Sequence, residues 1–145
     1  MAKPSTTPLL CPCGSGQTQA ECCQPFLSGA RQAPTAETLM RSRYTAYVCG
    51  NADYLLQTWH PQTRPATLDL GGSPAPHWLG LKIITTKDGA FGNHQGSVEF
   101  VARYKLNGKA LRLHECSEFS YENGCWYYMH GQQRKILPKK PAKPL

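Results

Sequence analysis

Four of the seven cysteines in this chain lie within thirteen residues near its N-terminus, in the stretch CPCGSGQTQAECC. Cys11 and Cys13 are separated by one proline, and Cys22 and Cys23 are adjacent. A disulfide within either pair would be strained, because bridged cysteines place their Cα atoms about 5.5 Å apart with the Cβ atoms facing each other. The proline and the glycines that follow it are typical of a tight turn. We therefore expect the segment to curl so that thiols from two separate turns lie close together.

A shared metal ion explains this spacing better than a disulfide does. The first pair can offer two thiolates from one turn, and the second pair can offer two more after an eight-residue excursion. Four thiolates that leave no position for water are typical of a closed, structural Zn²⁺ site. We predict such a site, with the ligands Cys11, Cys13, Cys22 and Cys23. Disulfides between the pairs and a reduced cluster without metal stay open as alternatives.

The choice between these states depends on the compartment. The first ten residues contain no apolar stretch of the roughly 7–15 residues that a signal peptide needs. No apolar run approaches the ~20 residues of a membrane span. We therefore expect a cytoplasmic protein without a membrane span, in a compartment that keeps thiols reduced.

The positive charge of the chain is concentrated at its C-terminus. The net charge is +7, and five basic residues without any acid lie in the last twelve positions: Arg134, Lys135, Lys139, Lys140 and Lys143. The remaining residues carry 11 basic and 9 acidic side chains. We interpret residues 134–145 as a solubilising tail rich in proline and lysine. A nucleic-acid or ribosome contact through this tail is the weaker alternative.

Residues 35–60 have the pattern of two helices. Thr35 is a suitable N-cap for the first helix, Gly50 a suitable stop, and Asn51 a suitable N-cap for a short second helix that ends before the proline at position 61. Arg41 and Arg43 flank the apolar stripe of the first helix, and we interpret them as part of a solvated face, with an anion site as the alternative. The stripe has the spacing i, i+4, i+7 and i+8 and consists of Met40, Tyr44, Tyr47 and Val48.

The pattern changes to a period of two after residue 77, which predicts strands. Alternating apolar residues occupy 79–83 and 98–106, and the pairs Asn107-Gly108 and Asn123-Gly124 are typical of two-residue hairpin turns. Residues 62–77 are rich in proline and glycine, and we expect a loop there. Helices followed by an antiparallel sheet predict an α+β fold.

The two hairpin turns predict a register, and the register predicts a pocket. Counting back from the turns places Glu115 opposite Phe100 and His130 opposite Ser117, all on one face of the sheet. Polar groups among aromatic residues on an inner face are typical of a small-molecule pocket. A carboxylate near an imidazole could also act as an acid–base pair. The alternative is that this end of the sheet is structural or solvent-exposed. The predicted lining is Val98, Phe100, Glu115, Ser117, Phe119, Tyr128 and His130.

Two stretches resemble known families. The stretch CPCGSG, followed eight residues later by CC, resembles the SEC-C motif, a small zinc-binding module in which all four cysteine positions are metal ligands. The family usually has lysines between the pairs, whereas this chain has QTQAE. Residues 35–61, with WLGL at 78–81 and NGCWYY at 123–128, resemble the YchJ-like bacterial family. That resemblance implies a cone resembling nuclear transport factor 2, and no particular activity.

We therefore expect three parts: a SEC-C zinc-binding motif at 9–30, a nuclear transport factor 2-like domain at 31–133 and a basic tail at 134–145. The chain shows no motif for a nucleophile, a phosphate loop or an open catalytic metal site. We favour a zinc-stabilised binding or adaptor protein, which docks a protein partner through the zinc module and holds a partner or small ligand in the cone. The alternative is an enzyme that uses Glu115 and His130 as an acid–base pair.

Overall fold

The structure is a computed structural model that describes residues 9–70 and 75–133. Its helical elements are η1 (Gln19–Glu21), α1 (Gln24–Leu27), α2 (Ala36–Cys49) and α3 (Ala52–Gln57). Its strands are β1 (His77–Asp88), β2 (Gln95–Leu106), β3 (Lys109–Glu122) and β4 (Cys125–Gln133). The α+β class is therefore confirmed. The predicted basic tail, 134–145, lies outside the described residues.

Helix α2 begins and ends as its sequence predicts. The Thr35 side chain accepts a hydrogen bond from the Thr38 backbone N–H at 3.1 Å, and Gly50 ends the helix in the left-handed conformation at φ 74°. Asn51 caps α3 in the same way, by accepting from the Tyr54 N–H at 3.0 Å. The predicted stripe is buried at its first positions, but Val48 at its end is 38% exposed. The sheet therefore covers most of this stripe, and its last position lies beyond the covered part.

The four strands form one antiparallel sheet in the order β1-β2-β3-β4. Asn107 and Gly108, and likewise Asn123 and Gly124, have positive φ, as two-residue turns of this type require. The predicted register of the first hairpin is confirmed, with Phe100 opposite Glu115.

The second hairpin follows its predicted register only near the turn. Phe119 lies opposite Tyr128 as expected, but a β-bulge follows between Glu118 and Phe119. Beyond this bulge Glu118 pairs with His130, and Ser117 pairs with Gly131. The prediction that His130 faces Ser117 is wrong, because one extra residue in β4 moves every later side chain to the other face.

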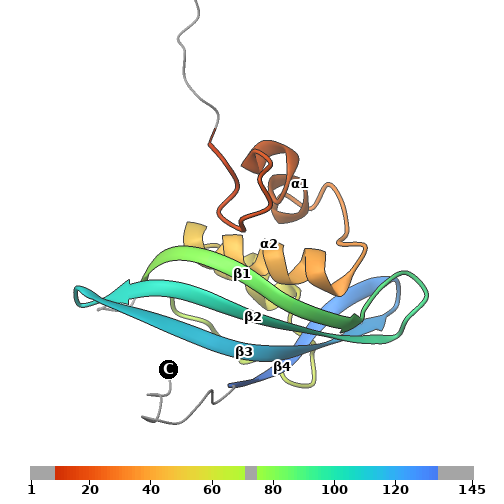
Figure 1. Ribbon diagram of the computed structural model, residues 1–145. Helices are drawn as coiled ribbons and strands as arrows, with labels where there is room; N and C mark the ends of the chain where they lie inside the picture. The colour runs from red at the N-terminus through yellow and green to blue at the C-terminus, as the bar shows by residue number, and fades with distance from the viewer. Residues whose placement is uncertain (1–8, 71–74, 134–145) are drawn as a thin grey trace, which may run out of the picture.

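Helix α2 lies across one face of the sheet, and the N-terminal segment lies on the far side of α2 (Figure 1). The buried core joins these layers, because three cysteines of the N-terminal segment belong to the same cluster as the sheet and helix residues. Fully buried apolar residues of this core include Leu39, Leu55, Val98 and Phe119. Within the described part of the chain, no helix is long and apolar enough to cross a bilayer.

Candidate metal centre and pocket

The four N-terminal cysteines lie together, on two short turns. Cys11 and Cys13 lie in one loop. This loop is closed by the bridge between Leu10 and Thr18 and by a 2.8 Å hydrogen bond from the Cys11 N–H to the Gln17 carbonyl. Cys22 and Cys23 lie between η1 and α1. Their four Sγ atoms all lie within 4.8 Å of one another, and three of the four residues are buried. We call Cys11, Cys13, Cys22 and Cys23 the cysteine cluster.

The spacing of these sulfur atoms fits a tetrahedral metal ion. The Sγ atoms of Cys13 and Cys22 are 3.6 Å apart, and those of Cys22 and Cys23 are 3.9 Å apart. A regular tetrahedron of zinc–sulfur bonds of about 2.3 Å has edges of about 3.8 Å. All four cysteines are free thiols rather than disulfides. The donor set and its spacing therefore fit Zn²⁺, and four thiolates would leave no open position on it.

The thiols of the cluster influence one another's protonation. A hydrogen bond from Cys23 lowers the pKa of Cys13 to about 4, and the same bond, with burial, raises the pKa of Cys23. Burial also raises the pKa of Cys22. Without a metal, Cys22 and Cys23 therefore keep their protons, and the Cys23 thiol donates a hydrogen bond to the Cys13 sulfur. A divalent cation would replace these protons, since a metal binds the thiolate form.

Side chains of helix α2 donate hydrogen bonds to the cysteine cluster. The Thr45 hydroxyl donates to Cys23 Sγ at 3.3 Å and lies 3.6 Å from Cys11 Sγ. The Arg41 guanidinium donates to the Cys13 carbonyl at 2.7 Å and lies 3.9 Å from Cys13 Sγ. The interpretation of Arg41 as part of a solvated face is therefore wrong for its donor end. Hydroxyl and guanidinium donors of this kind stabilise negative charge on sulfur.

A pocket lies on the other side of α2, between this helix and the sheet. Its volume is about 250 Å³, and we call it the α2 pocket. Its walls are mostly apolar and aromatic, with one carboxylate and one guanidinium. It is lined by Met40, Arg43, Tyr44, Tyr47, Trp78, Phe100, Ala102, Leu113, Glu115, Ser117 and Tyr128.

Glu115 is the acid of the α2 pocket. Burial raises the pKa of its carboxyl group. Its carboxyl group lies beside Gly131, the β4 residue opposite Ser117, where an added Cβ would lie only 2.9 Å from Glu115 Cδ. The absence of a side chain at Gly131 therefore leaves the space that the Glu115 carboxyl group occupies.

Arg43 is the base of the α2 pocket, and it is only 4% exposed. One guanidinium nitrogen donates to the Leu55 carbonyl and to the Thr58 hydroxyl, both at 2.8 Å. The guanidinium carbon lies 4.4 Å from the Tyr128 ring centroid and 5.0 Å from that of Trp59. Burial lowers the pKa of Arg43 to about 10, so it stays charged at neutral pH. The interpretation of Arg43 as solvated is wrong. Its position three residues after Met40 and four before Tyr47 places it within the apolar stripe.

The structure brings together only some of the residues predicted to line a pocket. Phe100, Glu115, Ser117 and Tyr128 do line the α2 pocket. Val98 and Phe119 are fully buried in the core beside it. His130 is exposed on the other face of the sheet, beside Glu118, because of the bulge in β4. The predicted pairing of Glu115 with His130 as acid and base is therefore wrong.

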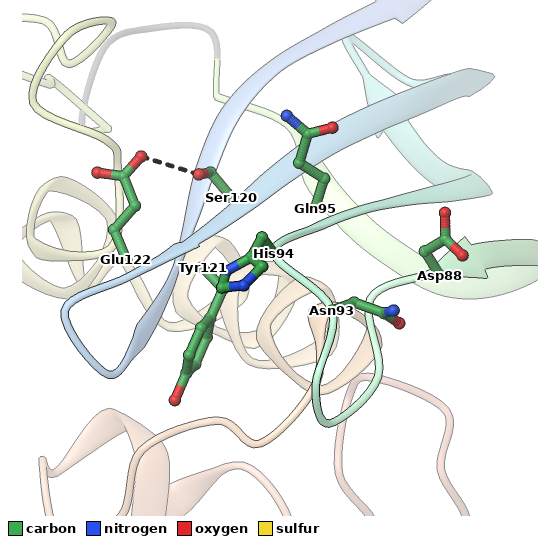
Figure 2. A pocket seen from close by; sticks show the side chains of 7 residues that line it. All are labelled: Asp88, Asn93, His94, Gln95, Ser120, Tyr121 and Glu122. Atoms are coloured by element: carbon green, nitrogen blue, oxygen red, sulfur yellow. Dashed lines mark hydrogen bonds between the residues drawn. The ribbon is translucent and has the colours of Figure 1, made fainter.

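A second hollow, of about 460 Å³, lies at the other end of the sheet (Figure 2). Asp88 ends β1, Asn93 and His94 belong to the β1–β2 connection, and Ser120 and Glu122 lie on β3. The hydrogen bond drawn in Figure 2 joins the Ser120 hydroxyl to a Glu122 carboxylate oxygen, at 2.9 Å. The acids at its two ends, Asp88 and Glu122, lie far apart in this view and do not point toward a common centre. We therefore assign the candidate site to the cysteine cluster and the α2 pocket.

The chain is similar to known bacterial proteins over most of its length. Residues 35–131 match the family described as YchJ, middle NTF2-like domain. A UPF0225 protein of Chromobacterium violaceum is 50% identical over 123 residues, which cover 83% of this chain and 90% of the relative. A UPF0225 protein of Streptomyces coelicolor is 48% identical over 122 residues, covering 84% of this chain and 94% of the relative.

Solved structures agree with this fold. The solution structure of a SEC-C motif containing protein from Rhodopseudomonas palustris has a TM-score of 0.73 and 35% identity, over 84% of this chain and 96% of that one. The crystal structure of a SEC-C motif containing protein from Psychrobacter arcticus has a TM-score of 0.65 and 25% identity, over 96% and 81%. The expected nuclear transport factor 2-like fold is confirmed. This chain belongs to the YchJ-like family, whose middle domain follows the N-terminal cysteine cluster.

Proposed function

We propose that this chain is a zinc-stabilised binding protein of the cytoplasm, without catalytic activity. In this proposal the N-terminal module, residues 9–30, docks a protein partner, and the α2 pocket holds a small ligand. The observation that carries the proposal is the closed arrangement of four sulfur donors, which packs against the same helix, α2, that lines the pocket.

The chemistry of the donor set supports a structural metal ion. Cys11, Cys13, Cys22 and Cys23 would be its four ligands, which excludes a water or substrate molecule from a tetrahedral ion. The ion would neutralise thiolate charge and fix the two turns relative to each other. Arg41 and Thr45 would then hold the closed cluster against α2.

Helix α2 connects the metal site to the pocket, because one of its faces contacts the cysteine cluster and another lines the α2 pocket. Arg41 and Thr45 contact the cysteine cluster, whereas Met40, Arg43 and Tyr44 line the pocket. At 3.6 residues per turn these two groups lie about a third of a turn apart around the helix. The ion would therefore hold in place the helix that forms one wall of the α2 pocket.

The α2 pocket supports a small ligand with an aromatic or flat apolar body. The rings of Tyr44 and Tyr47 both pack against Trp78 in its wall, with centroids 5.7 Å and 5.9 Å from that of Trp78. Glu115 offers the pocket a hydrogen-bond acceptor or, when protonated, a donor. A small, mostly apolar cavity with a few polar groups is how ligand sites are usually built.

Metal content and sulfur coordination test the first half of the proposal. Protein purified under reducing conditions should hold one zinc ion per chain, and X-ray absorption should show four sulfur neighbours at about 2.3 Å. A Cys11→Ser variant should lose most of this zinc, while Cys49→Ser, which changes an exposed cysteine outside the cluster, should keep it. Freshly reduced wild-type protein with far less than one zinc per chain would refute the metal site.

Binding measurements test the second half. A Ser117→Leu variant places an isobutyl group in the α2 pocket, whereas Glu118→Leu changes the neighbouring residue on the other face of the sheet. Aromatic fragments screened by NMR should shift resonances of pocket residues in wild type and in Glu118→Leu, and should lose these shifts in Ser117→Leu. Fragments that bind all three proteins alike would show that the ligand site lies elsewhere.

A further inference from the structure

The register of β1, β2 and β3 places a group of cations on the face of the sheet that is turned away from α2. Arg103 on β2 lies directly opposite Arg112 on β3, and Lys105 follows two residues later on the same face of β2. Lys82 on β1 lies opposite Val101, which precedes Arg103 by two residues and shares its face. All four cations are exposed, and we call them the outer basic patch.

In the register of β1, β2 and β3, no cation of the patch lies opposite an acid. Like charges directly opposite each other on neighbouring strands destabilise a sheet, and Arg103 and Arg112 have this relation. The nearest acid on this face, Glu99, is already paired with His114 at 2.7 Å. The ion pairs Glu37–Arg41, His60–Glu122 and Glu99–His114 join residues of the described chain. None of them includes a cation of the patch.

The sheet also makes room for one of these guanidinium groups. A Cβ added at Gly80, opposite Arg103, would lie 2.8 Å from Arg103 Nη2. The guanidinium of Arg103 therefore lies across β1 at the one residue there without a side chain. A guanidinium held along the sheet surface loses less freedom when it binds than one that moves freely in solvent.

The chemistry of the patch selects an anionic partner with closely spaced charges. Guanidinium groups bind phosphate oxygens through two parallel hydrogen bonds. Proteins that bind single strands add aromatic rings on which bases stack. The positions of β1, β2 and β3 on this face, read from the register, carry no Phe, Tyr or Trp. A duplex, with about one charge per 1.7 Å of axis, offers its phosphates without such stacking.

We propose that the outer basic patch binds the phosphate backbone of a nucleic-acid duplex. The patch belongs to the body of the protein and is separate from the tail at 134–145, the cysteine cluster and the α2 pocket. Sequence composition hides it, because the 11 basic and 9 acidic residues before the tail nearly cancel in number. The register shows that four of these cations gather on one face.

Fluorescence anisotropy with a labelled 20-base-pair DNA duplex tests the proposal, with a chain that ends at residue 133 to remove the tail. Four phosphate contacts predict that affinity falls roughly 100-fold between 50 and 200 mM salt. The variant Arg103→Gln/Arg112→Gln should bind on the order of 50-fold more weakly at 100 mM salt, with a salt slope smaller by about 2. Lys82→Gln/Lys105→Gln should weaken binding similarly, and gives an independent reading if the arginine variant unfolds.

A matched control separates the patch from net charge. Arg31→Gln/Lys87→Gln removes one charge between α1 and α2 and one at the far end of β1, and its affinity should stay within threefold of wild type. The proposal is overturned if this control loses as much affinity as the patch variants, or if folded patch variants bind as wild type does. It is also overturned if a 20-nucleotide single strand or a polyglutamate peptide binds the wild-type patch more tightly than the duplex.

Discussion

We expect the Thr45 hydroxyl to strengthen zinc binding by about 10–100-fold. Thr45 is fully buried, donates to Cys23 Sγ at 3.3 Å and lies 3.6 Å from Cys11 Sγ. A Thr45→Val change keeps the shape of the side chain and removes this donor. Loss of such a partner to a metal ligand typically costs 10–100-fold in metal affinity. That range corresponds to about 1.4–2.7 kcal/mol, because each tenfold change equals about 1.4 kcal/mol.

Competition with a chromogenic zinc chelator would measure this change directly. Thr45→Val should bind zinc 10–100-fold more weakly than wild type. Thr45→Ser is the matched variant, because it keeps the hydroxyl and loses only a methyl group, and its zinc affinity should stay close to that of wild type. If Thr45→Val binds zinc within twofold of wild type, or if Thr45→Ser is the weaker of the two, the hydroxyl does not support the metal and the role assigned to the α2 contact is wrong.

Other properties of the molecule should change in predictable ways. Chelation should raise hydrogen exchange in residues 9–30 before the sheet, because the sheet and α2 keep their own core; a single global transition would contradict this. Arg43→Met should lower the free energy of unfolding by about 2–4 kcal/mol in urea titrations, through loss of two charged hydrogen bonds and the ring contacts, whereas the exposed Arg64→Met should change it by much less. Burial raises the Glu115 pKa, so its stabilising contribution is full below its ordinary pKa of 4.5 and is lost as pH rises through the folded pKa. The free energy of unfolding of Glu115→Gln, relative to that of wild type, should therefore be higher at pH 8 than at pH 4. An equal difference between the two proteins at both pH values would exclude this burial effect. Deletion of 134–145 should leave the melting temperature unchanged, because that stretch has little apolar surface to bury.

The sequence predicts the cysteine cluster and the first hairpin well for a local reason. Ligand spacing and turn residues act over a few positions, so CPCGSG and Asn107-Gly108 each specify geometry without help from the rest of the chain. The register of β2 and β3 then follows for twelve pairs, as far as Gln95 and Ser120. A turn signal of this kind predicts the register of both strands correctly until a bulge inserts an extra residue into one of them.

The second hairpin shows where local reasoning stops. Its turn residues predict the pairing of Phe119 with Tyr128 correctly, but the stretch YYMHGQQ offers only Gly131 as a sign of the bulge that follows, and a single glycine does not fix the position of a bulge. The bulge has a structural counterpart, since Trp59 bridges to Tyr128 and the Tyr128 backbone exchanges hydrogen bonds with Thr58 and His60. The connection after α3 therefore pairs with β4 from outside the sheet. A contact between segments about seventy residues apart cannot be seen in a hairpin pattern, and it places His130 on the opposite face.

The composition of α2 holds a signal that a search for one apolar stripe misses. A helix covered on one side buries one stripe, yet Ser42, Thr45 and Ala46 are fully buried away from the stripe of Met40 and Tyr44. Small and hydroxyl residues at such positions let a second layer approach closely and give it hydrogen-bond partners, as Thr45 does for the cysteine cluster. The two arginines of α2 then differ in what covers them, because Arg41 lies under the module and Arg43, within the stripe, lies under the sheet. In a sequence, a cysteine cluster followed by a helix with small, polar flanks therefore indicates that the helix is covered on two sides.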